Sequence, residues 1–126
     1  MDDIRFEYED ERIKELFNDL NDIRCSRNLM RKQIGPELTK AVKKRYNEIK
    51  AHSCFSKLQQ GPGKIESLTG NLKGCYSLRL NANFRLIIKP KSYDLSVESL
   101  NNCDTVIIKG VLDYHGTGNR RNWLIP

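Results

Sequence analysis

One stretch decides the fold, and it runs Cys75-Tyr-Ser-Leu-Arg-Leu-Asn-Ala-Asn-Phe-Arg-Leu-Ile-Ile88. Apolar and polar residues alternate along both of its arms, which predicts two strands that each bury one face. A three-residue loop over 81–83 pairs Leu80 with Phe84 and keeps the apolar side continuous, whereas a two-residue loop would mix the faces. The stretch is therefore predicted to form a β-hairpin.

This register places Arg79 directly opposite Arg85 on the polar face of the hairpin. Like charges across a strand pair are destabilising unless an anion lies between them, and the planar guanidinium group suits a phosphate. The pair is therefore a candidate phosphate site. The alternative interpretation is that both side chains lie over a solvated face, with their stems packed on neighbours.

The length and composition predict one small domain. The chain has 126 residues, and we expect 1–126 to form a single domain with a tail from about residue 116. No apolar run is long enough to span a membrane, and the first residues lack a basic-then-apolar leader. A cytoplasmic location without a membrane partner is expected.

The charge is unevenly distributed along the chain. Residues 1–22 hold nine acidic and three basic residues, whereas 23–50 hold nine basic and two acidic residues. An acidic opening before a basic body suits a protein that meets a polyanion on one surface. A solvated charged helix explains part of the same count.

The cysteines and histidines give no metal motif. Cys25, Cys54, Cys75 and Cys103 are widely spaced, without a Cys-x-x-Cys pair or a histidine at a ligand offset. We expect neither a metal nor another cofactor.

The order of the expected elements indicates an α+β fold. A short strand over 4–8 precedes a helix capped by Asp10 and a second helix that starts at Pro36. Extended segments follow, and the strongest strand, 105–115, contains Gly110 at a plausible bulge. We expect an N-terminal strand and a helical hairpin packed on one face of a mostly antiparallel, twisted sheet of four or five strands.

The chain resembles the RelE/ParE superfamily of bacterial toxins, most closely its HigB type, in four features taken together. These are the basic helix, the Leu68-Thr-Gly turn after it, the hairpin and the Asp113-Tyr-His115 ending. The similarity covers roughly 4–115. It implies a toxin of a type II toxin–antitoxin system that acts as a ribosome-dependent mRNA endonuclease, an mRNA interferase that blocks translation. It also implies a helix-turn-helix, HigA-like antitoxin as partner, besides the ribosome and mRNA, with operator DNA reached only through that antitoxin.

The resemblance also implies site residues. Arg85 matches the arginine of the second hairpin strand, and Asp113, Tyr114 and His115 match the carboxyl-terminal catalytic cluster. Arg79 matches a basic position on the first hairpin strand of the RelE branch.

The chain departs from the family around the Leu-x-Gly turn. Well-studied HigB members have a histidine and a lysine there, where this chain has Glu66 and Thr69. Lys64 and Lys73 lie close enough in sequence to take over a cationic, phosphate-binding role.

The expected chemistry needs no metal, because RNA carries its own nucleophile in the 2′-hydroxyl. His115 would exchange a proton with the 2′-hydroxyl or the 5′-oxygen, while Asp113 fixes its tautomer. On a regular strand Asp113 and His115 share the face of Lys109, and Tyr114 points the other way unless Gly110 or the strand end turns it round. Tyr114 would then stack on a base or donate a hydrogen bond.

Two other functions remain open. A ParE-like protein of the same superfamily would inhibit DNA gyrase and cleave nothing. A noncatalytic nucleic-acid-binding module would need only the net positive charge.

Overall fold

The structure is a computed structural model that describes residues 3–18, 20, 27–61, 65–114 and 122–125. Its helices are α1 (Glu11–Asn18), α2 (Leu29–Ile34), α3 (Pro36–Lys50), α4 (Phe55–Gln59) and α5 (Val97–Asn101), with a short 3-10 helix η2 (Gly70–Leu72). Its strands are β1 (Arg5–Tyr8), β2 (Glu66–Ser67), β3 (Tyr76–Arg79), β4 (Phe84–Pro90), β5 (Thr105–Asp113) and β6 (Asn122–Ile125).

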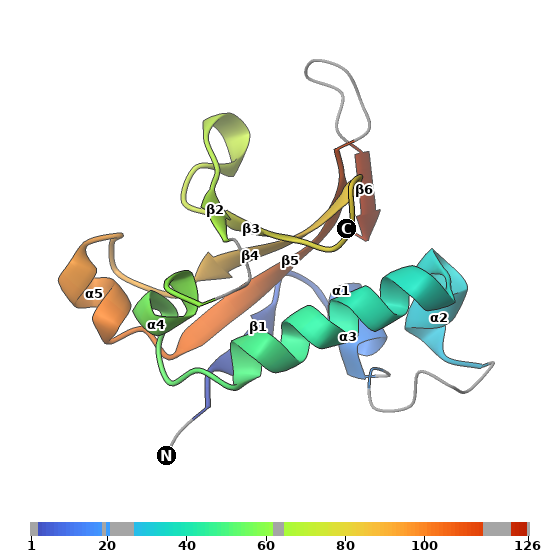
Figure 1. Cartoon of the computed structure of the whole chain (residues 1–126), viewed down its shortest axis with the longest axis horizontal. Coiled ribbons are helices and arrows are strands. Elements are labelled where there is room, and N and C mark those ends of the chain that lie inside the picture. The colour runs from blue at the N-terminus through green and yellow to red at the C-terminus, as the bar shows by residue number, and fades with distance from the viewer. Residues whose placement is uncertain (1–2, 19, 21–26, 62–64, 115–121, 126) are drawn as a thin grey trace.

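All six strands belong to one sheet with the order β1-β5-β4-β3-β2, and β6 also pairs with β5 (Figure 1). The β1–β5 pair is parallel and all the other pairs are antiparallel. β1 pairs with the first half of β5 and β6 with its last residues, so both flank β5 on the side away from β4. The expected mostly antiparallel sheet is confirmed.

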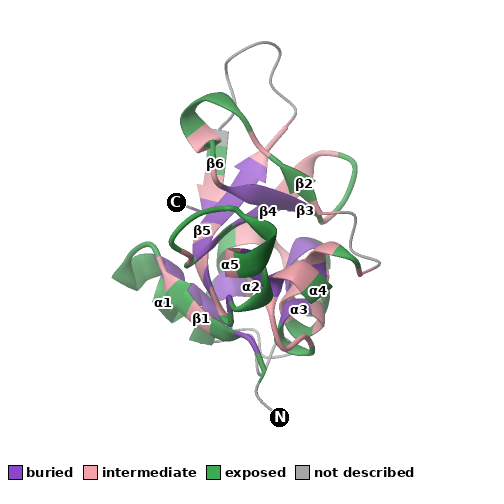
Figure 2. Ribbon diagram, turned by 90° about the vertical axis from the view of Figure 1, so that its left-hand side faces the viewer, coloured by how far each residue is buried: buried purple, intermediate pink, exposed green. Residues whose placement is uncertain are grey.

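The helices and the main core lie on one face of the sheet (Figures 1 and 2). Buried side chains of α1, α2, α3 and α4 pack there against the inward residues of the strands, among them Leu78, Leu86, Ile108 and Val111. On the opposite face Cys75, Ile87 and Leu112 form a second, smaller cluster. The α+β fold with helices on one face is therefore confirmed, and within the described ranges most of the second face carries no helix.

The helix starts follow from local chemistry. The Asp10 carboxylate accepts a hydrogen bond from the backbone N–H of Ile13 at 2.9 Å, which satisfies a free donor in the first turn of α1. Pro36 begins α3, where its missing N–H removes no helical hydrogen bond. Val42 and Ile49 on α3 are completely buried, as the apolar stripe of this helix predicts.

The structure adds three elements to those expected from the sequence. Helices α4 and α5 have only five residues each, too few for a helical period to stand out. Within the expected tail, Asn122–Ile125 forms β6, and Ile125 is completely buried. No helix in the described part of the chain is long and apolar enough to cross a membrane.

Candidate functional site: an arginine pair on the open face of the sheet

The hairpin has the predicted three-residue loop. The backbone N–H of Leu80 donates to the carbonyl oxygen of Phe84 at 3.0 Å, which closes the loop over residues 81–83. Inside the loop the Asn81 side-chain oxygen accepts hydrogen bonds from the backbone N–H groups of Asn83 and Phe84, at 2.8 and 2.9 Å. The asparagine therefore holds the loop in the shape that sets the strand register.

Arg79 pairs with Arg85, as predicted. Because Leu80 and Phe84 form a hydrogen-bonded pair, the next pair along is of the non-hydrogen-bonded type, in which the Cα atoms lie about 4.5 Å apart and the side chains are closest. Arg85 also pairs with Leu112 of the smaller cluster. Both arginines therefore lie on the face of the sheet opposite the helices, which we call the open face. Within the described residues neither guanidinium group forms an ion pair with a carboxylate.

Arg85 is held in place by its neighbours. Its guanidinium carbon lies 4.9 Å from the centre of the Tyr114 ring, a cation–π contact. Its Nη1 donates to the carbonyl oxygens of Asn81 and Phe84, at 2.7 and 3.1 Å. Among the described residues, Nε and Nη2 of Arg85 donate no hydrogen bond, so they remain available to an incoming anion.

Arg79 is exposed, and its backbone is tied to α3. The Nε of Arg45 donates to the Arg79 carbonyl oxygen at 2.7 Å, and the same guanidinium group forms a 2.7 Å ion pair with Glu48. This contact could not be predicted from local sequence patterns, because it joins residues that are far apart in the chain. It fixes the end of β3 while leaving the Arg79 side chain toward solvent.

A bulge in β5 decides which side chains join the arginines. Ile87 pairs with Gly110 and Ile88 with Ile108, so Lys109 is an extra residue on β5. Beyond this bulge Asp113 pairs with Phe84, which packs against the helix-side core. Tyr114 packs against the opposite, smaller cluster.

The bulge predicted at Gly110 is confirmed, and Tyr114 points away from the side of Asp113, as expected for a regular strand. The alternative in which Tyr114 turns to the face of Asp113 is therefore wrong. The extra residue inverts the alternation after position 109, which turns Tyr114 toward Arg85 and Asp113 toward the helix side. The sequence marked the bulge through its glycine but did not show how it would shift the pairing.

An apolar floor lies beside the arginine pair. Cys75, Ile87 and Leu112 are buried there, with Leu68, Leu72 and Tyr114 packed against them. Burial raises the pKa of the Cys75 thiol, although the charges of Lys109 and Lys89 act in the opposite direction. Cys75 is therefore a packing residue, and the floor strengthens electrostatic interactions at its edge because it excludes water.

The other predicted site residues are less close to the pair. Lys73 is exposed in the turn before β3, whereas Arg79 ends that strand, so about 10 Å of strand separates them. Glu66 and Thr69 are both exposed, and Glu66 pairs with Ser77. Lys64 and His115 lie outside the described residues.

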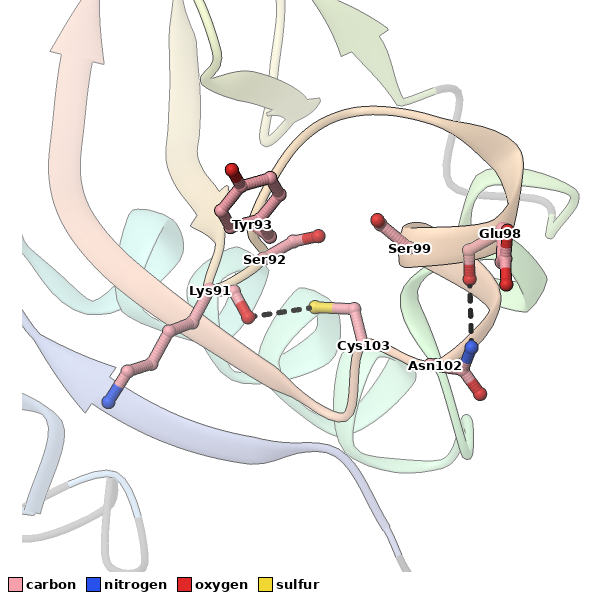
Figure 3. A pocket seen from close by; sticks show the side chains of 7 residues that line it. All are labelled: Lys91, Ser92, Tyr93, Glu98, Ser99, Asn102 and Cys103. Atoms are coloured by element: carbon pink, nitrogen blue, oxygen red, sulfur yellow. Dashed lines mark hydrogen bonds between the residues drawn. The ribbon is translucent and has the colours of Figure 1, made fainter.

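A cavity of about 340 Å³ lies elsewhere, beside α5 (Figure 3). Cys103 donates there to the Lys91 carbonyl oxygen, Asn102 donates to that of Glu98, and the ammonium group of Lys91 is paired with Glu7 at 2.7 Å. Its polar groups are thus largely engaged with one another. In the described ranges no three His, Cys, Asp or Glu side chains gather closely enough to hold a metal ion.

Comparisons with known proteins identify the class. The family described as "RelE-like toxin of type II toxin-antitoxin system HigB" matches residues 6–115. Two solved structures, the YoeB-YefM complex and the heterotetrameric YoeB-YefM toxin-antitoxin complex, both from Staphylococcus aureus, contain chains similar to this one. Each match has 18% sequence identity, covers 90% of this chain and 98% of the other, and has a TM-score of 0.51. No curated protein sequence matches the chain significantly.

The sheet with its helices on one face is thus the fold of a RelE-like toxin. The chain belongs to the HigB-like toxin family of type II toxin–antitoxin systems.

Proposed function

We propose that this toxin is a ribosome-dependent mRNA endonuclease that blocks translation. One observation carries the proposal: Arg79 and Arg85 face each other on neighbouring strands, and neither forms an ion pair within the described residues. Two adjacent guanidinium groups repel each other, so an anion between them is strongly favoured. The phosphate of an RNA linkage gains charge during cleavage and is stabilised most at such a position.

The reaction would proceed without a metal ion. The 2′-oxygen attacks the phosphorus, the bond from phosphorus to the 5′-oxygen breaks, and the products are a 2′,3′-cyclic phosphate and a 5′-hydroxyl. The proton of the 2′-hydroxyl leaves to a base, and the 5′-oxygen gains a proton. We assign proton exchange to His115 and charge stabilisation to Arg85 and Arg79.

Tyr114 and Asp113 receive different roles. The Tyr114 ring makes a cation–π contact with Arg85, and we assign it the role of orienting the guanidinium group toward the phosphate. Asp113 faces the helix side and is the last residue of β5, the strand that contributes Leu112 to the apolar floor. We therefore propose Asp113 as a positioning residue for His115 and the strand end, and Lys73 and Lys64 as further phosphate contacts along the RNA.

The partners follow from the family. We propose a helix-turn-helix, HigA-like antitoxin that holds the toxin inactive, and the ribosome with its mRNA as the target. The toxin would reach operator DNA only through the antitoxin. It would act in the cytoplasm, where translation takes place.

The test is a translating extract in which cleavage of mRNA is mapped by primer extension. The wild-type protein is expected to cut in phase with codons, and Arg85→Ala and His115→Ala are expected to abolish the cuts. Arg12→Ala, which removes an exposed arginine from α1, is the matched control and should cut normally. Inhibition of DNA supercoiling without any cut would instead establish a gyrase inhibitor, and nucleic-acid binding without either effect would leave a noncatalytic module.

A further inference from the structure

One row of side chains crosses four neighbouring strands on the open face. Arg79 pairs with Arg85, Arg85 with Leu112, and Leu112 with Trp123. Directly paired residues project from the same face of a sheet, so the row runs from two cations over a buried leucine to an indole ring. Because neighbouring strands lie about 4.8 Å apart, Trp123 is about 10 Å from Arg85 at the level of the backbone.

Trp123 is exposed on a well-anchored strand. Its side chain is 40% exposed, whereas Ile125 on the same strand is completely buried in the helix-side core. The carbonyl oxygen of Leu124 also accepts a hydrogen bond from the Gln33 side chain of α2 at 3.3 Å. The strand is thus fixed from the helix side, while its one aromatic ring is presented on the other.

The indole also lies against Gly110. A Cβ atom at that glycine would be 3.1 Å from the Cε3 atom of Trp123, so the ring edge occupies the space left by the missing side chain. An aromatic ring that packs over a strand glycine is confined in its orientation. The ring is therefore preorganised, and its exposed part is a flat apolar surface beside a cationic pair.

We propose that Trp123 stacks on a base of the bound RNA, beside the linkage that Arg79 and Arg85 hold. Binding sites for single-stranded nucleic acids combine cations along the backbone with aromatic rings under the bases, and this row has both. The inference rests on the proposed function, and it adds the path of the RNA, which crosses the strands from β3 toward β6. Trp123 lies beyond residues 6–115, the part that matches the family.

The experiment is a double-mutant cycle that combines a substitution in the protein with a modification of the RNA. It is carried out on ribosomes programmed with a synthetic mRNA. Cleavage rates are measured for wild type, Trp123→Leu and Trp123→Phe, each with normal mRNA and with an abasic nucleotide at successive positions around the cut. We expect Trp123→Leu to lower the rate by about 5- to 150-fold, the range for one stacked base, and Trp123→Phe to retain most of it. At one position the abasic nucleotide should lower the cleavage rate of the wild-type protein by the same factor as Trp123→Leu does on normal mRNA. At that position it should cause no further decrease in the rate of Trp123→Leu.

Each other outcome overturns a specific statement. If the rate decreases caused by Trp123→Leu and by the abasic nucleotide multiply at every position, the two changes act independently and the stacking proposal is wrong. A cleavage rate of Trp123→Leu equal to that of wild type has the same meaning. In both cases the proposed nuclease activity is retained. If Trp123→Leu cleaves normally but escapes neutralisation by the antitoxin, the ring belongs to a protein interface instead. Absence of cleavage by the wild-type protein overturns the nuclease and the stacking proposal together.

Fluorescence gives a second measurement, because the chain contains a single tryptophan. A short 2′-O-methyl RNA, which cannot be cleaved, is expected to quench the emission of Trp123. An abasic sugar-phosphate strand of the same length should bind the arginines without this quenching. Equal quenching by both strands, or by neither at concentrations where binding is saturated, contradicts the proposal. Circular dichroism of Trp123→Leu confirms that the variant is folded.

Discussion

The backbone of Gly110 passes so close to the carbonyl oxygen of Ile125 that no side chain fits between them. Gly110 also has a φ angle of +140°, which residues with a Cβ atom rarely adopt. This contact lies at the bulge that inverts β5 and allows β6 to pair beside it. The position of Tyr114 next to Arg85 therefore depends on a residue without a side chain.

Gly110→Ala is accordingly expected to destabilise the protein strongly. The new methyl group would collide with the Ile125 carbonyl oxygen, and alanine would also have to adopt the unfavourable φ angle. The free energy of unfolding should therefore fall by about 3 kcal/mol or more. Gly70→Ala is the control, because Gly70 has a φ of +65° but open space around it, and should lose only about 1–2 kcal/mol. Urea denaturation followed by circular dichroism measures both, and equal losses would contradict the close contact.

Arg85→Lys is expected to abolish most of the activity although the charge is kept. Lysine has no planar group to lie over Tyr114 and to direct two donors at a phosphate, so we expect a decrease of about 100-fold in cleavage rate. Arg12→Lys, an exposed exchange on α1, should leave the rate unchanged. Single-turnover cleavage on ribosomes provides the rates. A fully active lysine variant would show that charge alone suffices.

Asn81→Asp separates stability from activity. An aspartate retains the acceptor for the backbone N–H groups of Asn83 and Phe84, so the free energy of unfolding should not decrease. The new carboxylate lies in the loop that Arg85 contacts and competes with the substrate phosphate, so cleavage should slow. Asn81→Ala loses both hydrogen bonds without adding charge and should be about 1–2 kcal/mol less stable. Thermal unfolding and cleavage rates of both variants test this, and full activity of the aspartate variant would refute it.

Cys54 is expected to react with iodoacetamide faster than Cys75 and Cys103 near neutral pH. Partial burial by itself would raise the Cys54 pKa, but hydrogen bonds from the Ser56 hydroxyl and the Lys57 backbone, with the charge of Lys57, lower it overall. Burial raises the pKa of both other thiols, so less reactive thiolate is present.

Peptide mass spectrometry over a time course gives the alkylation rate of each thiol. Ser56→Ala should slow the reaction of Cys54, because it removes the hydroxyl that lies 3.3 Å from the sulfur. Earlier labelling of Cys75 than of Cys54 would show that the order of thiol pKa values is wrong.

The hairpin, α1 and α3 could be predicted from the sequence because their signals are local. Alternation along the two arms fixed which residues face each other, and Asp10 and Pro36 marked the helix starts. The arginine pair followed from the same local register.

The remaining features depend on contacts between distant segments. The direction in which the bulge turned Tyr114 depends on how β5 aligns with β4, and β6 becomes a strand only because β5 offers it an edge. Arg45 and Arg79 meet through the packing of α3 beside β3. None of these contacts leaves a periodic pattern in the chain.

The pairing of β1 with β5 has a consequence for how the protein acquires its shape. Phe6 lies beside Val106, so this parallel contact closes a loop of about one hundred residues, whereas the arginine hairpin forms between neighbours. Contacts so distant in sequence form late, because the entropy lost on loop closure precedes any gain. When the toxin is separated from a tightly bound partner by denaturation and then refolded, the hairpin is expected to form first. Full activity is expected to return only when β1 has paired with β5.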